Sequence, residues 1–307
     1  MTTTFKTIDP TQLPTNEVYQ HLSTAVAPRP IGFASTIDKA GDVNLSPFSF
    51  FNVFSANPSI LVFSPVKSSR TNQHKDTFLN VQKVPEVVIN IVNYAMVEQM
   101  SLASTAYEKG VNEFVKSGFT QVPSDVVRPP RVGESPISFE CTVEQIIQLG
   151  NGPGSGNLVV AKVVRMHLNE AFLDTNGQLD TLKMDLVGRM GGSWYCRMTP
   201  EALFEIPKPI RRKGIGVDQL PESIRQSSVL TGNNLGRLGN VEKLPSGIDF
   251  EVLINREIFQ SILNDSHTNK PQKVNQWHRL AQQKLENGQT DLALQYLLLC
   301  DWWSIQN

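Results

Sequence analysis

One polar segment of the chain has the residue types and the setting of a phosphate-binding loop. It runs from Ser64 to Thr77, follows an apolar stretch typical of a strand, and leads into a predicted helix. The start of a helix presents unpaired backbone N–H groups, and cations beside it strengthen the attraction for an anion. The segment supplies cationic or ionisable side chains and hydroxyl donors, namely Lys67, Arg70, His74, Lys75, Ser68, Ser69, Thr71 and Thr77. It is a candidate phosphate site, with a solvated polar loop as the alternative interpretation.

Asp76 is the member of this segment that does not suit a phosphate, because a carboxylate repels it. Two roles would explain its presence. It could cap a helix over residues 77–84, or it could hold a Lys or Arg of the loop in place.

A second candidate combines hydroxyl, amide and aromatic side chains on two predicted neighbouring strands. Ser35 and Thr36 lie near the end of the first strand, and residues 44–52 supply Ser, Asn and Phe residues on the next. Polar edges beside an apolar face suit a planar heteroaromatic ligand. The alternative is that the phenylalanines simply fill the core.

A third candidate is the segment from Gly188 to Tyr195, which contains paired glycines. Glycines allow the backbone to approach a flat ligand closely, and Arg189, Trp194 and Tyr195 supply charge and stacking surface. The segment does not match the GxGxxG pattern and follows no clear parallel strand, which disfavours a Rossmann dinucleotide site.

Several classes of function lack their signals in this sequence. There is no nucleophile elbow, HExxH, CxxC or Walker A motif, and the five histidines are dispersed, so we assign no catalytic side chain and no metal site. Lys plus Arg number 28 against 29 Asp plus Glu, a net charge of −1 that argues against nucleic-acid binding. No apolar run approaches the roughly 20 residues that span a bilayer. The three cysteines are odd in number and far apart, which favours a reducing cytoplasm.

The first two hundred residues have the pattern of a mainly β domain with helices. Strands are predicted over 30–37, 43–55, 59–65, 86–93, 137–148 and 158–168, and helices over 77–84 and 96–105. The last two strands flank the glycine-rich segment 150–156, which is typical of a hairpin connection. Strands joined by short turns, with helices interspersed, favour a closed antiparallel barrel over a doubly wound sheet.

The composition changes after about residue 205, so we expect two domains, 1–205 and 206–307. The second begins with a basic connector containing Pro207, Pro209, Arg211, Arg212, Lys213 and Gly214. Two helices are predicted after it, over 274–285 and 291–303, and their apolar stripe is expected to pack on the barrel or on a partner.

Short motifs occurring in order along the first two-thirds of the chain resemble the flavin reductase-like, FMN-binding split-barrel family. They are APRPIGFAST at 27–36, GDVNLSPFSFFN at 41–52, KDT at 75–77, NEF at 112–114, SP at 135–136 and FEC at 139–141. Within the family, the resemblance is to the branch containing flavoredoxin and nitrilotriacetate monooxygenase component B. It covers residues 24–198 and not the C-terminal extension.

The resemblance implies a Greek-key split β-barrel that binds FMN near the interface of a homodimer. It implies that the flavin ring is bordered by Ser35, Thr36, Asn44, Leu45 and Ser46. It implies that the ribityl-phosphate end lies near Ser64, Arg70, Lys75, Asp76 and Thr77. Arg189 would lie near the ring or the nicotinamide.

The expected function is NAD(P)H-dependent hydride or electron transfer of the flavin or ferric reductase type. Hydride transfer to flavin N5 is the cofactor's own chemistry, so the lack of an acid–base pair is expected. Two alternatives stay open: a flavoredoxin-like electron carrier without its own nicotinamide reaction, and a non-enzymatic FMN-binding scaffold. The sequence does not decide between NADH and NADPH, nor whether FMN is prosthetic or a substrate. It also leaves open whether a partner oxygenase receives the electrons.

Overall fold

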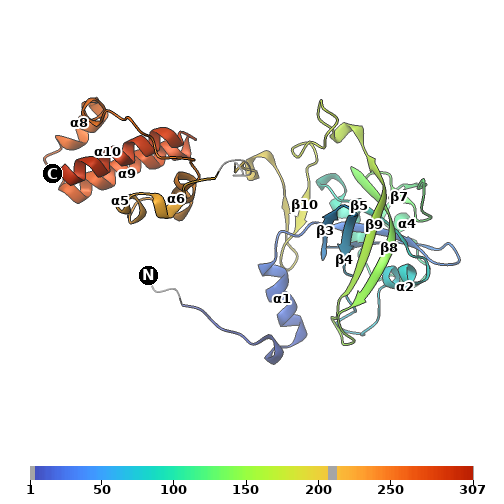
Figure 1. The fold of residues 1–307 in the computed structure, drawn as a ribbon. Helices are drawn as coiled ribbons and strands as arrows, with labels where there is room; N and C mark the ends of the chain where they lie inside the picture. Colours follow the sequence, from blue (N-terminus) through green and yellow to red (C-terminus); the bar gives the residue numbers. More distant parts are fainter. Residues whose placement is uncertain (1–3, 207–212, 307) are drawn as a thin grey trace. The chain divides into compact units, whose positions relative to one another are not determined.

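The computed structural model describes residues 4–206 and 213–306 (Figure 1). The chain divides into two compact units, Met1–Phe204 and Glu205–Asn307. Residues 207–212, which form most of the predicted basic connector, lie outside the described residues.

The first unit is built on a seven-stranded antiparallel sheet. Its strand order is β2-β1-β5-β8-β9-β4-β3. The strands are β1 (Gly32–Ile37), β2 (Val43–Phe48), β3 (Phe51–Ala56), β4 (Ser59–Phe63), β5 (Glu86–Ile91), β8 (Ile137–Gln148) and β9 (Asn157–Leu168). The predicted antiparallel barrel and the β8–β9 hairpin are therefore confirmed.

The sheet must curl because its two edge strands are neighbours in the chain. β2 and β3 lie at opposite ends of the strand order, yet only Ser49 and Phe50 separate them. Three peptide steps reach at most about 11 Å, so the two edges meet at this joint. No pairing joins β2 to β3 within the described residues, and the barrel is split there. The single return segment predicted over 43–55 is thus two strands that belong to opposite edges.

Two apolar layers lie on the two faces of β1, and all six of its residues are buried. Ala34 faces the barrel interior with Phe63 and Ile89. Phe33 faces an outer cluster with Met100 and Phe114, which come from short helices packed outside the sheet. A strand buried on both faces explains why its residues do not alternate between apolar and exposed polar side chains.

The remaining elements of the first unit are short. The helices are α1 (Thr15–Ala25), α2 (Asp76–Lys83), α3 (Val97–Leu102) and α4 (Glu113–Ser117). The 3-10 helices are Pro10–Gln12, Tyr94–Met96, Glu170–Phe172 and Pro200–Ala202. Two small hairpins pair β6 (Gln121–Val122) with β7 (Arg131–Val132) and β10 (Val187–Arg189) with β11 (Tyr195–Arg197).

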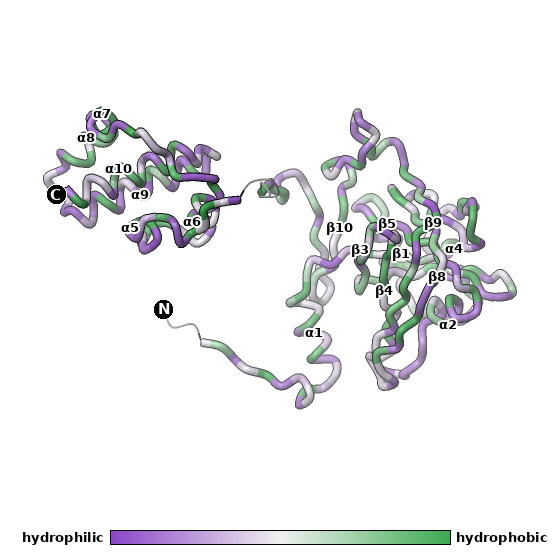
Figure 2. The backbone as a smooth tube through the Cα atoms, in the orientation of Figure 1, coloured by the Kyte–Doolittle hydropathy of each residue, from purple (hydrophilic) through white to green (hydrophobic). Residues whose placement is uncertain are grey.

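The second unit is a helical bundle with a core of its own. It contains a 3-10 helix (Val217–Gln219), α5 (Glu222–Arg225), α6 (Gly232–Gly239), α7 (Phe250–Ile254), α8 (Glu257–Leu263), α9 (Lys270–Glu286) and α10 (Thr290–Gln306). Figure 2 shows apolar residues recurring along α9 and α10. Fully buried Trp277 and Leu297 from these two helices pack with Ile224, Leu238 and Phe259.

The predicted helical pair is confirmed as α9 and α10, but the expectation that the barrel or a partner covers its apolar stripe is wrong. Helices α5 to α8 cover it within the unit. They are four to eight residues long and too short to give a periodic signal in the sequence. No helix in the described part of the chain has the length and apolar character needed to cross a membrane.

Candidate functional site

A cavity of about 180 Å³, called the Lys75 cavity below, brings together three of the residues expected to bind the cofactor, Ser46, Ser64 and Lys75. They come from β2, from the end of β4 and from the start of α2. The rest of the lining is Tyr19, Pro47, Phe48, Ser49, Phe50, Val66 and Ser104. The cavity therefore combines hydroxyl groups and one cation with an apolar, partly aromatic wall.

The start of α2 beside this cavity has no side-chain cap. Lys75 occupies the N-cap position, and its backbone carbonyl accepts from the N–H groups of Phe78 and Leu79. Among the described residues, no acceptor is found for the N–H groups of Asp76 and Thr77. Free N–H groups at a helix start, next to a lysine, form a setting that attracts an anion.

The expectation that Asp76 caps this helix is wrong, since Asp76 is the first residue inside it. The alternative, a partner for Lys or Arg, is not seen either: no ion pair of Asp76 exists within the described residues. Asp76 instead lines a separate small cavity with Asn44 and Glu113. Burial, and to a lesser degree the charge of Asp76, raise the pKa of the Glu113 carboxyl.

The loop from Ser64 to Lys75 is fastened to the glycine-rich turn between β8 and β9. The Ser64 hydroxyl accepts from the backbone N–H of Asn157 at 3.1 Å, and Lys67 Nζ donates to the Asn151 carbonyl at 3.1 Å. The Lys67 ammonium therefore stabilises the fold by binding the turn, whereas Lys75 lines the cavity. Arg70 is exposed and lies outside the cavity lining.

Thr36, Asn44 and Thr77 join α2 to the first two strands. Asn44 Nδ2 donates to Thr77 Oγ1 at 2.8 Å, and Asn80 Nδ2 donates to Thr36 Oγ1 at 3.2 Å. None of the three lines the cavity. Their hydrogen bonds fix the position of the start of α2, where Lys75 occupies the N-cap position.

Ser35 and Leu45 are fully buried and lie outside the cavity lining. The backbone N–H of Leu45 donates to Glu113 Oε2 at 2.9 Å, and its side chain belongs to the outer apolar cluster. Ser35 Oγ has no hydrogen-bond partner among the described residues. Leu45 therefore has a structural role in packing and backbone hydrogen bonding, while the buried Ser35 hydroxyl has no hydrogen-bond partner among the described residues.

Arg29 is a buried arginine that contacts Ser49 of the cavity lining, and the sequence predicted no role for it. Its guanidinium donates to the carbonyls of Ser23 and Val26 at the end of α1, to the Met190 carbonyl, and to Ser49 Oγ. Burial lowers the pKa of Arg29. The one signal available was an arginine set between two prolines, a pattern that names no role.

Arg189 lies on β10, where its backbone pairs with that of Arg29. Its guanidinium sits 4.5 Å from the centre of the Tyr195 ring. Tyr195 lines a different cavity of about 210 Å³, together with Tyr94 and Arg197. Arg189 therefore lies outside the Lys75 cavity, whose lining does not include it.

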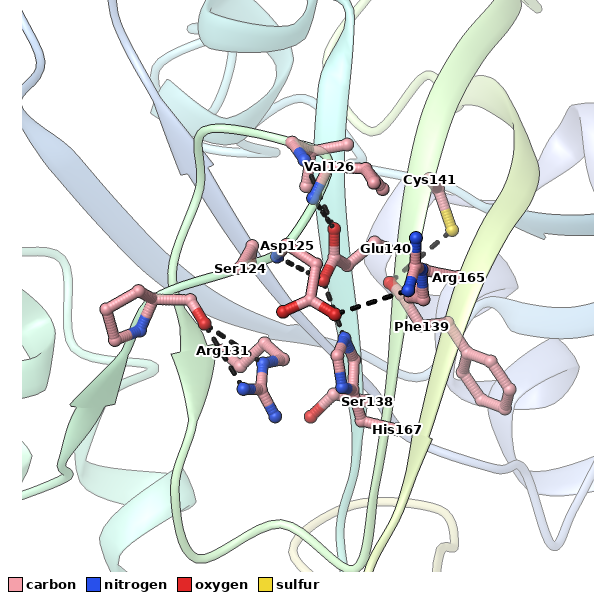
Figure 3. Close-up of polar contacts among 12 residues, drawn as sticks. Ser124, Asp125, Val126, Arg131, Ser138, Phe139, Glu140, Cys141, Arg165 and His167 are labelled. Atoms are coloured by element: carbon pink, nitrogen blue, oxygen red, sulfur yellow. Dashed lines mark hydrogen bonds and ion pairs between the residues drawn. The ribbon is translucent and has the colours of Figure 1, made fainter.

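A buried carboxylate forms a second polar centre in the barrel (Figure 3). Glu140 on β8 is fully buried and accepts from the N–H groups of Asp125, Val126 and Val127 at 2.8, 2.7 and 3.1 Å. His167 Nε2 lies 2.6 Å from Glu140 Oε1. Burial alone would raise the pKa of Glu140, but these N–H groups and the imidazole hold the pKa below its ordinary value.

Asp125, Glu140 and His167 have the spacing of a metal-ligand group, since their ligand atoms all lie within 4.8 Å. Both oxygens of Glu140 are already engaged by donors, and Asp125 is paired with Arg165 at 3.4 Å. This arrangement is that of an anchor that holds the loop after β6 against β8 and β9.

Comparisons with known proteins agree with this fold. The family model of the flavin reductase-like domain matches residues 24–183. A protein of Halalkalibacterium halodurans without an assigned function is 35% identical over 190 residues, 61% of this chain and 90% of that protein.

Among solved structures, nitrilotriacetate monooxygenase component B from Bacillus cereus gives a TM-score of 0.62 at 26% identity, covering 67% of this chain and all of that one (100%). The 2-nitrobenzoate 2-nitroreductase of Pseudomonas fluorescens gives 0.57 at 27% identity, covering 66% of this chain and 96% of that one.

The chain belongs to the flavin reductase-like family of split-barrel proteins. The family resemblance found in the sequence motifs is confirmed, and with it the class of flavin-related oxidoreductases.

Proposed function

We propose that the barrel unit binds FMN and transfers a hydride from NAD(P)H to it, as a flavin or ferric reductase does. The observation that carries the proposal is the cavity where Ser46, Ser64 and Lys75 meet beside the uncapped start of α2. A cation and hydroxyl donors in one cavity, next to the start of a helix, suit a phosphate better than any neutral ligand.

The residues present fit a flavin mononucleotide in two respects. The polar part of the lining suits its phosphate, and Tyr19, Pro47, Phe48 and Phe50 suit a planar ring. At about 180 Å³ the cavity is smaller than the roughly 300–1,000 Å³ of ordinary ligand pockets, so it holds part of the nucleotide only. The remainder must lie on surface outside it.

The protein's own work in this reaction is binding and orientation. Bound FMN supplies a hydride acceptor at N5 and passes electrons on. Lys75 would balance part of the phosphate's charge, and the hydroxyl groups would donate hydrogen bonds to it. The Thr36–Asn80 and Asn44–Thr77 hydrogen bonds hold α2 in place, and the apolar wall excludes water. No side chain has to move a proton for a hydride to pass.

The proposal includes a homodimer, which works in the cytoplasm. Val53 and Phe54 on the edge strand β3 are 64% and 68% exposed, an apolar pair that a second copy would cover.

Three free cysteines in separate places support a reducing compartment. The similarity to a monooxygenase component supports an oxygenase as one acceptor of the electrons.

The test is anaerobic mixing of the FMN-loaded protein with NADH and with NADPH. Bleaching of the yellow oxidised flavin within seconds supports the reductase and identifies the donor. A flavin that stays oxidised with both, but is reduced by dithionite, supports the electron carrier instead. A protein that takes up no FMN contradicts the proposal.

A further inference from the structure

The helix α1 is a wall of the Lys75 cavity, and it lies mostly before residue 24, where the match to the family model begins. It reaches the cavity through Tyr19. Of the 11 residues of α1, Ser23 is the one that is buried. So short a helix is marginal alone, and its position must be fixed by contacts other than an apolar core.

Close backbone approach and one arginine hold α1. A Cβ atom on Gly154 would lie 2.8 Å from Thr15 Cγ2, and one on Gly191 would lie 3.0 Å from Thr24 Cβ. The two ends of the helix therefore rest on two glycine-containing turns, where only glycine leaves room. Arg29 binds the carbonyls of Ser23 and Val26 at the C-terminal end.

This attachment leaves the Tyr19 ring available at the cavity. The ring centre lies 6.0 Å from that of Phe50, and the planes are tilted by 55°. Phe50 belongs to the joint between β2 and β3 and lines the same cavity. Tyr19 is 52% exposed, so half of its surface remains for a ligand to cover. Two tilted rings beside a cationic, hydroxyl-lined recess form a wall for a ligand that joins a flat ring to an anion.

We propose that Tyr19 contacts the ring of the bound flavin and sets how tightly this cavity holds it. This inference rests on the proposed function, because it assumes that the cavity binds FMN. The phenol ring packs on the flavin, and α1 supplies this part of the cavity wall.

Flavin fluorescence gives a direct readout of such contact. A tyrosine that touches an excited flavin donates an electron to it and takes the electron back, which quenches the emission. Loss of an aromatic contact should weaken binding about 3- to 10-fold. We therefore expect Tyr19→Ala to weaken FMN binding by this factor and to brighten the bound flavin severalfold, while Tyr19→Phe keeps affinity within about twofold.

The matched control is Leu22→Ala, an exposed apolar residue of the same helix outside the cavity lining. It should leave both affinity and emission as in the unchanged protein. The experiment is a fluorescence titration of the full-length protein and the three variants with FMN. If Tyr19→Ala binds FMN with unchanged affinity and emission, the role of Tyr19 is overturned while the proposed function stands. If the unchanged protein binds no FMN, both are overturned.

Discussion

The Glu140 anchor and the Lys75 cavity are two polar regions of one barrel, and they differ in how far their polar groups are satisfied. Glu140 is surrounded by three backbone donors and one imidazole. Lys75 lines an open cavity, and the first N–H groups of α2, which follow it in the chain, have no acceptor among the described residues. Both regions are rich in charge and hydrogen-bonding groups. Only the region around Lys75 has polar groups without a hydrogen-bond partner among the described residues.

The difference separates a structural polar cluster from a candidate binding site. A carboxylate such as Glu140, whose two oxygens already accept hydrogen bonds, gains no further stabilisation from a ligand. Removing it leaves buried donors without partners. An unsatisfied cation beside a helix start gains its partner only when a ligand arrives. Stability should therefore depend on the first region and ligand affinity on the second.

The largest expected effect is on stability, from Glu140→Gln. The amide keeps the size of the side chain but removes the charge that four donors share, and its NH₂ group faces backbone N–H groups. We expect a loss of about 3 kcal/mol in the free energy of unfolding. Chemical denaturation measures it, with exposed Glu144→Gln on the same strand as control. An equal loss in both variants would break the comparison.

The next effect concerns affinity. Lys75→Ala should weaken FMN binding by about 1.5–3 kcal/mol, because it removes one charge-assisted contact to the phosphate. Unfolding should change little, since the side chain is exposed. Lys83→Ala, in the last turn of the same helix, is the control, and exposed Arg70→Ala should cost less than Lys75→Ala. Flavin titration with unchanged affinity for Lys75→Ala would remove the phosphate assignment.

A smaller effect distinguishes Glu140 from Glu113 by pH. The folded pKa of Glu140 lies below its ordinary value of 4.5, so its stabilisation is present above pH 4.5 and is lost as the pH falls through the folded value. The folded pKa of Glu113 lies above 4.5, so stability falls as the pH rises through that value.

Glu113→Gln should therefore remove the decline on the alkaline side, while its oxygen still accepts from Leu45. We expect the variant to be more stable than the unchanged protein at neutral pH, where the Glu113 carboxyl is ionised at a cost to the folded state. Unfolding curves from about pH 3 to about pH 8 compare the two variants. A Glu113→Gln profile parallel to that of the unchanged protein would contradict the raised pKa.

The smallest expected effect comes from removing the helical unit. Because that unit covers its own core, a chain ending at residue 206 should keep FMN affinity within about twofold. The measurement is the same titration, with sedimentation to check the oligomeric state. A soluble dimer of the shortened chain that binds no flavin would show that the helical unit contributes to the site.

The sequence predicted those parts of the fold and site that local patterns encode. Strand periodicity located the β8–β9 hairpin. The polar loop between a strand and a helix pointed to Lys75 and the family resemblance to Ser64, and the structure places both at one cavity. Tyr19, Ser49 and Ser104 reach the same cavity from three distant segments, and no local pattern links them. Arg29 and Glu140 were out of reach for the same reason, since their partners are backbone groups contributed by other elements.

The prediction that Asp76 caps α2 was wrong because the helix boundary lies one residue earlier than expected. An acidic residue before a helical pattern suggests a cap, but the helix begins one residue earlier, and Lys75 takes the cap position. Helix boundaries depend on tertiary placement, here on the hydrogen bonds from Asn44 and Asn80 that seat α2 on the strands.

The turn between β8 and β9 has a bearing on how this protein can be engineered. A glycine-rich surface hairpin is ordinarily the first place to insert a tag or a reporter domain. Here the turn carries the Asn151 carbonyl that holds Lys67 and the Gly154 backbone on which Thr15 rests. An insertion would disturb both the loop from Ser64 to Lys75 and the position of α1.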